Sequence, residues 1–153
     1  MISIRNIFML NISHYKIIAI GKIKKKWIQE GIEMYLKRLP GLEVKEIKDS
    51  TQLKEEHTIK EIISKNEFLV TLNENGQSFT SKQLATKLLN SHNQNITFVI
   101  GGASGLTSSL NNLASWQLSL SPLTFPHEIA RLLLIEQLYR AKTITQGGPY
   151  HKG

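Results

Sequence analysis

Short apolar runs alternate with amphipathic segments along most of this chain. The run at residues 15–21 is rich in β-branched residues and ends at Gly21, which predicts a buried strand. Between residues 24 and 39, apolar side chains recur at helical spacing, and Pro40-Gly41 ends that segment. The same reasoning predicts further strands at residues 42–47, 67–72, 96–100 and 116–120, and further helices at residues 55–65, 80–90, 108–114 and 127–145.

Two polar segments predict where one strand ends and where one helix begins. Asn73-Glu74-Asn75-Gly76 is rich in turn-forming residues and predicts the end of the third strand. Thr80-Ser81-Lys82-Gln83 matches a capping box, in which the Thr hydroxyl and the Gln side chain satisfy backbone N–H groups at a helix start. Because strands and helices alternate, the sequence predicts an α/β fold with a mainly parallel sheet flanked by helices. Ligands of such sheets bind beyond the strand carboxyl ends, which fall here at residues 72–73, 101–105 and 121–127.

The length of 153 residues predicts a single domain, which we place at residues 15–153 after an N-terminal extension of unknown role at residues 1–14. There is no cysteine, which excludes disulfides, thiolate nucleophiles and cysteine-based zinc sites. The histidines show no metal-binding spacing, so we expect no metal. The sequence has neither a signal-peptide cleavage site nor a long apolar run, and we expect a cytoplasmic protein without membrane association.

The formal net charge is +7, from 19 Lys and Arg against 12 Asp and Glu. A basic domain attracts polyanions, because neutralised phosphates release their condensed counterions. On charge alone RNA, DNA and an anionic membrane are all suitable partners. A basic soluble protein without such a partner is an equally good interpretation.

Two loops are candidates for ligand binding. Gly101-Gly102-Ala103-Ser104-Gly105 follows a strand, and its glycines allow the backbone to approach a ligand closely. It lacks the G-x-G-x-x-G pattern and a later acidic partner, which argues against a dinucleotide site; an ordinary tight turn is the alternative. Two prolines restrict residues 121–127, which favours a rigid loop facing a small ligand or, alternatively, a simple strand-to-helix connection.

The last predicted helix and the tail after it carry most of the remaining chemistry. Apolar residues cover most of the helix circumference, so one face can pack in the domain and another can meet a second copy, which predicts a symmetric homodimer. Glu136 and Arg140 are spaced for an intrahelical ion pair. His127, Tyr150, His151 and Lys152 are candidates for proton transfer, base stacking or phosphate contact.

Four segments together closely resemble the RlmH family, which are small SPOUT-class methyltransferases of the bacterial large ribosomal subunit. The segments are Phe98–Leu106 (FVIGGASGL), Ser119–His127 (SLSPLTFPH), Ala130–Ala141 (ARLLLIEQLYRA) and Pro149–Lys152 (PYHK), and the resemblance runs from about Tyr15 to the end. It implies a C-terminal trefoil knot, S-adenosylmethionine as methyl donor without a metal, and a homodimer. The implied acceptor is N3 of a pseudouridine in 23S rRNA, within the large subunit or the whole ribosome.

The resemblance also implies site residues, which we add to those found above. The donor-binding candidates are Leu72, Gly101, Gly102, Leu120, Ser121, Pro122, Leu123, Thr124 and Phe125. The candidates for positioning and proton handling are His127, Glu136, Arg140, Tyr150 and His151, with Arg131 and Lys152 as RNA contacts. The base is left open, and the tail and the donor pocket can come from different subunits. The alternatives are a non-catalytic RNA- or ribosome-binding knotted dimer and an enzyme acting on another RNA.

Overall fold

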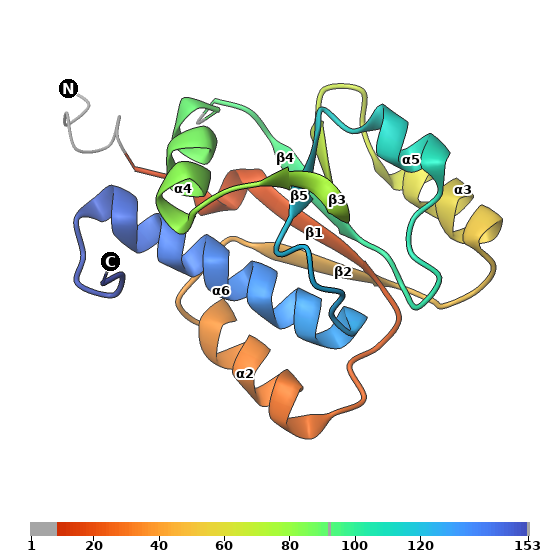
Figure 1. The fold of residues 1–153 in the computed structure, drawn as a ribbon, viewed down its shortest axis with the longest axis horizontal. Coiled ribbons are helices and arrows are strands. Elements are labelled where there is room, and N and C mark those ends of the chain that lie inside the picture. The colour runs from red at the N-terminus through yellow and green to blue at the C-terminus, as the bar shows by residue number, and fades with distance from the viewer. Residues whose placement is uncertain (1–8, 92, 153) are drawn as a thin grey trace.

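The computed structural model describes residues 9–91 and 93–152. Its centre is a five-stranded sheet in the order β2-β1-β4-β3-β5, and all neighbouring strands are parallel (Figure 1). This confirms the predicted α/β class with a parallel sheet. The strands are β1 Tyr15–Ile20, β2 Glu43–Ile47, β3 Phe68–Ser78, β4 Ile96–Ile100 and β5 Trp116–Ser119.

Helices cover both faces of the sheet. On one face α6 lies between α2 and α4, and on the other face lie α3 and α5 (Figure 1). The helices are α2 Lys26–Leu36, α3 Gln52–Ile62, α4 Ser81–Asn90, α5 Ser108–Leu113 and α6 His127–Gln146, with a short 3-10 helix η1 at Ile12–His14. No helix within the described ranges is long and apolar enough to cross a membrane.

The central strand β1 shows why the sheet needs helices on both sides. Ile17 and Ala19 pack into the core under α2, α4 and α6, whereas Ile18 and Ile20 pack under α3 and α5. All four are at most 1% exposed, as expected for a strand whose alternating side chains are buried on both faces. A continuous apolar run of this kind is typical of a parallel sheet.

The prediction that β3 ends at the Asn73–Gly76 turn is wrong. Leu72 and Gln77 both pair with Leu118 of β5, so the four residues between them form a bulge and the strand continues to Ser78. Gly76 is needed at this point, because a Cβ atom there would lie 2.7 Å from the carbonyl oxygen of Gln117. The turn-forming residues are therefore used inside the strand, at the sheet edge where the cavity described below lies.

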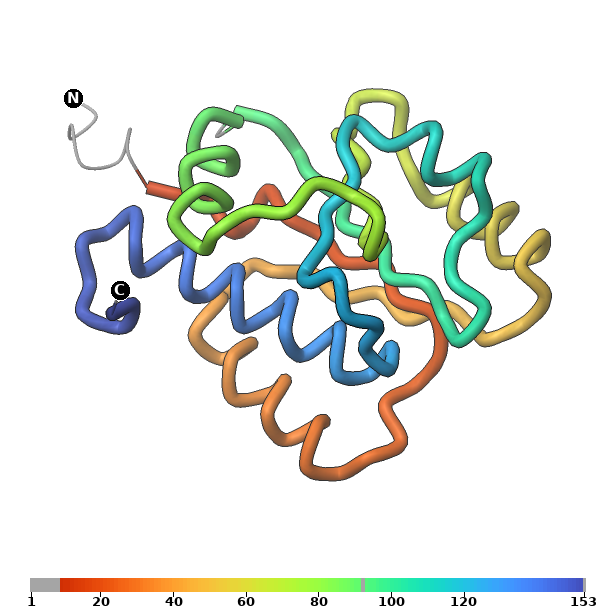
Figure 2. Tube along the Cα trace, in the orientation of Figure 1, coloured from red at the N-terminus to blue at the C-terminus, as the bar shows by residue number. Residues whose placement is uncertain are grey.

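The two ends of the described chain are tied to the domain. Before β1, Leu10 and Ile12 are buried in the main core, so residues 10–14 pack with the domain, while residues 1–8 of the proposed extension lie outside the described ranges. After α6, Gly147 has a left-handed backbone (φ 72°), and Gly148 N–H donates to Thr143 O at 2.8 Å. This helix ending turns the tail back beside α6 (Figure 2).

The capping box predicted at Thr80 is confirmed. The Thr80 side chain accepts from the Gln83 backbone N–H at 3.1 Å, and Gln83 accepts from the Thr80 backbone N–H at 2.8 Å. The reciprocal pair satisfies two backbone donors that α4 leaves unpaired at its start. It fixes the point at which the chain leaves β3 and enters α4.

Candidate functional site

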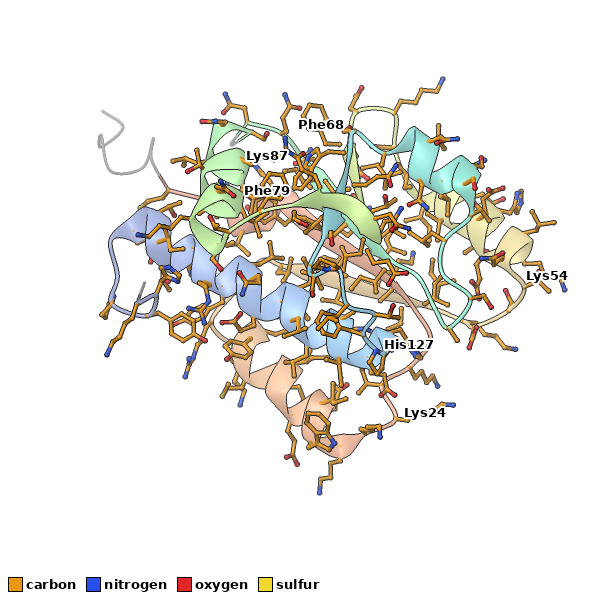
Figure 3. The ribbon with its side chains drawn as sticks, in the orientation of Figure 1. Lys24, Lys54, Phe68, Phe79, Lys87 and His127 are labelled. Carbon is orange, nitrogen blue, oxygen red and sulfur yellow. The ribbon has the colours of Figure 1, made fainter. Side chains whose placement is uncertain are left out.

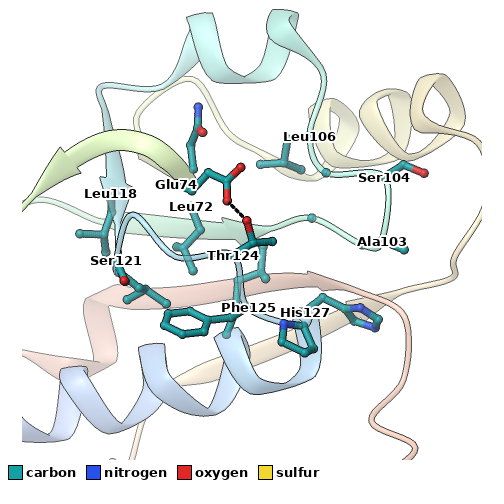
Figure 4. Close-up of a pocket in the computed structure, with 18 of the residues that line it drawn as sticks. Leu72, Glu74, Ala103, Ser104, Leu106, Leu118, Ser121, Thr124, Phe125 and His127 are labelled. Atoms are coloured by element: carbon teal, nitrogen blue, oxygen red, sulfur yellow. Dashed lines mark hydrogen bonds between the residues drawn. The ribbon is translucent and has the colours of Figure 1, made fainter.

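A cavity of about 770 Å³ lies at the bulge of β3 and beyond the carboxyl ends of β4 and β5 (Figure 4). Its volume is in the range of small-molecule sites, and its place is the one expected for a parallel sheet. The three strand-end loops predicted from the sequence meet here. The predicted residues that line the cavity are Leu72, Gly101, Gly102, Leu120, Ser121, Leu123, Thr124, Phe125 and His127; Pro122 is in the same loop but is not a lining residue.

The glycine loop after β4 is tightly closed. A Cβ atom on Gly101 would lie 2.8 Å from the carbonyl carbon of Gly105, and Gly105 itself has φ +73°. From α3, the Gln52 side chain donates to the carbonyl oxygens of Ser104 at 2.6 Å and Gly105 at 3.3 Å. The loop therefore presents a fixed backbone surface to the cavity.

The opposite wall is the loop between β5 and α6. The Ser121 hydroxyl accepts from the Leu123 N–H at 3.0 Å, and the Ser119 hydroxyl is 3.0 Å from the carbonyl oxygens of both Ser121 and Glu74. The Thr124 hydroxyl donates to the Glu74 carboxylate, a contact that joins this loop to the β3 bulge (Figure 4). The bulge and the loop thus form one connected rim.

Glu74 was missed by the sequence reasoning, which assigned its segment to a turn. It is the one carboxylate among the residues lining this cavity, and His127 is the only other titratable side chain there. The available signal was its position two residues after Leu72, because residues that follow the predicted end of a parallel strand are expected at the ligand edge of the sheet. Asn73 of the same bulge also lines the cavity, as do residues 103–106 of the loop after β4.

Four of the predicted residues, together with Tyr35, form a separate cluster, which we call the tail cluster. It consists of Tyr35, Glu136, Arg140, Tyr150 and His151. The Glu136 carboxylate, with a side chain 13% exposed, accepts from Arg140 Nη2 at 2.6 Å and from the Tyr150 hydroxyl at 3.0 Å. Arg140 Nη1 lies 3.1 Å from His151 Nδ1, and the two tyrosine hydroxyls are 3.0 Å apart. The predicted helix ion pair is thus the centre of a larger network.

Hydrogen-bond rules fix the proton positions in the tail cluster. A guanidinium only donates, so His151 Nδ1 accepts from Arg140 and a neutral His151 carries its proton on Nε2. A carboxylate only accepts, so the Tyr150 hydroxyl donates to Glu136 and accepts from Tyr35. Burial, together with hydrogen bonds to Tyr35 and Glu136, raises the pKa of Tyr150 above its usual range. The cluster therefore offers hydrogen-bond donors that are held in fixed positions around the Glu136–Arg140 ion pair.

The tail cluster does not line the cavity. Glu136 and Arg140 follow His127 by nine and thirteen residues in one continuous helix, which at 1.5 Å per residue places them about 14 to 20 Å along its axis. The structure therefore brings the predicted donor-binding residues together with His127 and separates them from Glu136, Arg140, Tyr150 and His151 within one chain.

The two predicted RNA contacts differ in exposure. Arg131 is 3% exposed, pairs with Glu46 at 2.5 Å and donates to the carbonyl oxygen of Gly21 at 2.8 Å. Its charge is engaged inside the protein, so we drop it from the proposed RNA contacts. Lys152 is exposed and remains a candidate.

Comparisons with known proteins show the family to which this chain belongs. A family model described as a predicted SPOUT methyltransferase matches residues 13–151. The chain belongs to this family. Two curated relatives carry the name ribosomal RNA large subunit methyltransferase H, which confirms the resemblance to RlmH. The one from Prochlorococcus marinus (strain NATL1A) is 99% identical over 94% of this chain and 99% of its own length, and that from Synechococcus sp. (strain CC9311) is 53% identical over 94% and 99%.

A solved structure supports the SPOUT fold of this family member. A probable methylase family protein from Haemophilus influenzae superposes with a TM-score of 0.60, over 94% of this chain and 72% of that chain. The two sequences are 12% identical, so the likeness concerns the fold alone.

Proposed function

We propose that this SPOUT methyltransferase transfers a methyl group from S-adenosylmethionine to N3 of a pseudouridine in large-subunit rRNA. The observation that carries the proposal is the cavity that the three strand-end loops line together, in a chain so similar to large-subunit rRNA methyltransferases. We further propose that the last third of the chain forms the trefoil knot expected of the family.

The cavity suits this donor in shape and charge. Leu72, Leu106 and Phe125 supply apolar surface for a purine, and the glycine loop supplies backbone groups. Glu74 supplies a single negative charge beside a ligand that carries a positive one. The sulfonium of S-adenosylmethionine provides an activated methyl group, so the protein needs to align the acceptor and stabilise the charge that develops on it.

The acceptor side of the site is the tail cluster of a second copy. About 14 to 20 Å of helix separates this cluster from the donor cavity in one chain, too far for both to contact one base. In a symmetric homodimer each cavity can be completed by the tail of the other subunit, and two equivalent composite sites result.

The tail cluster can stabilise the acceptor in its reactive form. N3 lies between two carbonyl groups, and its deprotonation gives an anion shared with their oxygens. The Arg140 guanidinium and the Nε2 proton of His151 are suited to those oxygens, while Glu136 and Tyr35 hold the donors in place. Because these groups donate protons, we assign removal of the N3 proton to solvent or to His127 at the cavity.

Two measurements test this function. Isothermal titration should show S-adenosylmethionine binding, and methyl transfer should occur to ribosomal particles, with mass spectrometry locating the product at N3 of a pseudouridine. Transfer should be faster to assembled particles than to naked rRNA, because a domain of this size offers little surface for recognising one nucleotide. Donor binding without methyl transfer to any rRNA substrate would favour the non-catalytic alternative.

A mixing experiment tests the composite site. A Gly101→Ala chain, defective in the cavity, is co-expressed with a chain lacking residues 150–153, defective in the tail. In mixed dimers one of the two sites combines an intact cavity with an intact tail, so a statistical mixture should recover about a quarter of the wild-type activity. No recovery, with mixed dimers shown to form, would place both parts of the site in one subunit.

A further inference from the structure

An exposed basic segment lies next to the donor cavity and has no role in the site described above. It consists of Lys22, Lys24, Lys25, Lys26 and Trp27, and all five residues are exposed. Trp27 is 59% exposed, and it is the one aromatic among the exposed large hydrophobic side chains of residues 9–91 and 93–152. The only ion pair of these lysines within that part of the chain is Lys26–Glu30, at 3.9 Å between side chains 90% and 63% exposed. Such a pair contributes little and leaves the charges available.

The segment is fixed in place by α6. The Glu128 carboxylate accepts from the backbone N–H groups of Lys24 at 2.6 Å and Lys25 at 3.2 Å, and hydrogen bonds from the amides of Lys25 and Lys24 lower the pKa of Glu128. Arg131, one helical turn later, donates to the carbonyl oxygen of Gly21. The Glu128 carboxylate thus accepts hydrogen bonds from the backbone of the two lysines, and their side chains are exposed.

This attachment places the segment beside the cavity. His127 lines the cavity, and Glu128 is the next residue of α6. The amides of Lys24 and Lys25 donate to Glu128, so the segment lies beside the edge of the cavity (Figure 3). Arg131, whose predicted RNA contact we dropped above, instead supports the loop that carries the lysines.

We propose that residues 22–27 form the rRNA-docking surface of this enzyme, in which the lysines contact phosphates and Trp27 stacks on an unpaired base next to the target nucleotide. The inference rests on the proposed function and adds the surface that holds the acceptor strand. Several lysines around one exposed aromatic ring are the chemistry of single-stranded nucleic-acid binding. A second copy of the chain is a poorer occupant, because it carries a formal net charge of +7 itself and would have to bury these lysines.

The test compares two double variants that lose the same charge. Lys24→Gln/Lys25→Gln removes it from the proposed surface, and Lys54→Gln/Lys65→Gln removes it near the ends of α3, on the opposite face of the sheet. Binding to purified large ribosomal subunits is measured by filtration from about 50 to about 200 mM salt, the range in which phosphate contacts dominate. Titration with S-adenosylmethionine shows that each variant keeps its donor cavity.

We expect the Lys24/Lys25 variant to bind ribosomal subunits about tenfold more weakly and its slope of log affinity against log salt to fall by about 1.5, as for two lost phosphate contacts. Trp27→Ser should weaken binding about tenfold, whereas Trp27→Phe should retain most of it, because stacking needs only a flat ring. A salt slope equal to that of the Lys54/Lys65 variant would overturn the proposal, as would Trp27→Ser splitting a dimer into monomers. Because binding and methyl transfer are measured separately, failure of the docking surface is distinguishable from failure of the proposed reaction.

Discussion

The donor cavity and the tail cluster are built on different principles. The cavity is formed mainly by backbone, from loops whose course is fixed by close contacts at Gly76 and Gly101 and by side chains behind them such as Gln52. The tail cluster is formed by side chains, in a network around Glu136 on the surface of α6. If the proposed function is correct, a rigid backbone frame holds a small ligand common to many enzymes, whereas the chemistry on the substrate depends on individual side chains.

This difference has consequences for how each region responds to mutation. In the cavity a single added methyl group at Gly101 meets backbone atoms that cannot move aside. In the tail cluster Glu136, Arg140 and Tyr150 each have two partners, so one lost hydrogen bond leaves the other in place. Substitutions in the two regions should therefore separate donor binding from turnover.

The largest effect is expected from removing residues 150–153. This deletion takes Tyr150 and His151 from the network around Glu136, so methyl transfer to ribosomal particles should be abolished. Donor affinity measured by titration should stay the same, because Tyr150, His151 and Lys152 do not line the cavity. Full residual activity would show that the tail has no part in the reaction.

Gly101→Ala should instead weaken donor binding, through a change in the cavity and not in the tail. Its Cβ would lie 2.8 Å from the carbonyl carbon of Gly105 and 3.0 Å from Leu106 N, which forces the loop open. We expect S-adenosylmethionine to bind at least about tenfold more weakly. The control is Gly148→Ala, where the nearest atom is 3.5 Å away and the titration should match that of the wild type.

Tyr150→Phe should have an intermediate effect on turnover alone. The variant keeps the ring contacts with Tyr139 and Arg140 but loses the hydroxyl that donates to Glu136. We expect kcat to fall about tenfold with donor affinity unchanged. Because the pKa of Tyr150 is raised, the hydroxyl of Tyr150 should add no step of its own to the profile of kcat against pH near the ordinary pKa of tyrosine, so the profiles of the wild type and the variant should have the same shape. Such a step, absent in the variant, would mean that Tyr150 exchanges the proton.

Glu74→Gln should produce the smallest change in donor affinity, and it tests whether the negative charge of Glu74 contributes to ligand binding. Loss of the carboxylate should weaken S-adenosylmethionine about threefold, and the uncharged product S-adenosylhomocysteine less. Thr124→Val removes the link between loop and bulge without changing charge, so it should affect both ligands equally. The exposed Glu43→Gln is the matched control. If Glu74→Gln weakens the binding of both ligands equally, the charge of Glu74 does not contribute and its role is only to join the bulge to the loop.

Much of the fold was predictable because its signals are local. The apolar run of β1, the Thr80 capping box and the long apolar pattern of α6 each depend on neighbouring residues, and each is found where predicted. The course of β3 was not predictable, because Asn73–Gly76 carries turn chemistry whether the chain reverses or only bulges. Pairing with β5, some 40 residues later, decides between the two outcomes.

The sequence by itself determined the alternation of strands and helices, the strand ends at which a ligand binds and, through its resemblance to a family, the residues to examine there. Tertiary structure alone decided that Glu74 enters the cavity, that Arg131 is used to hold the Gly21 loop, and that the tail residues gather at Glu136 far from His127. The physical reason is that propensity and periodicity act over a few residues. Which side chains meet depends on packing between segments distant in the chain, and on the length of the helix that separates them.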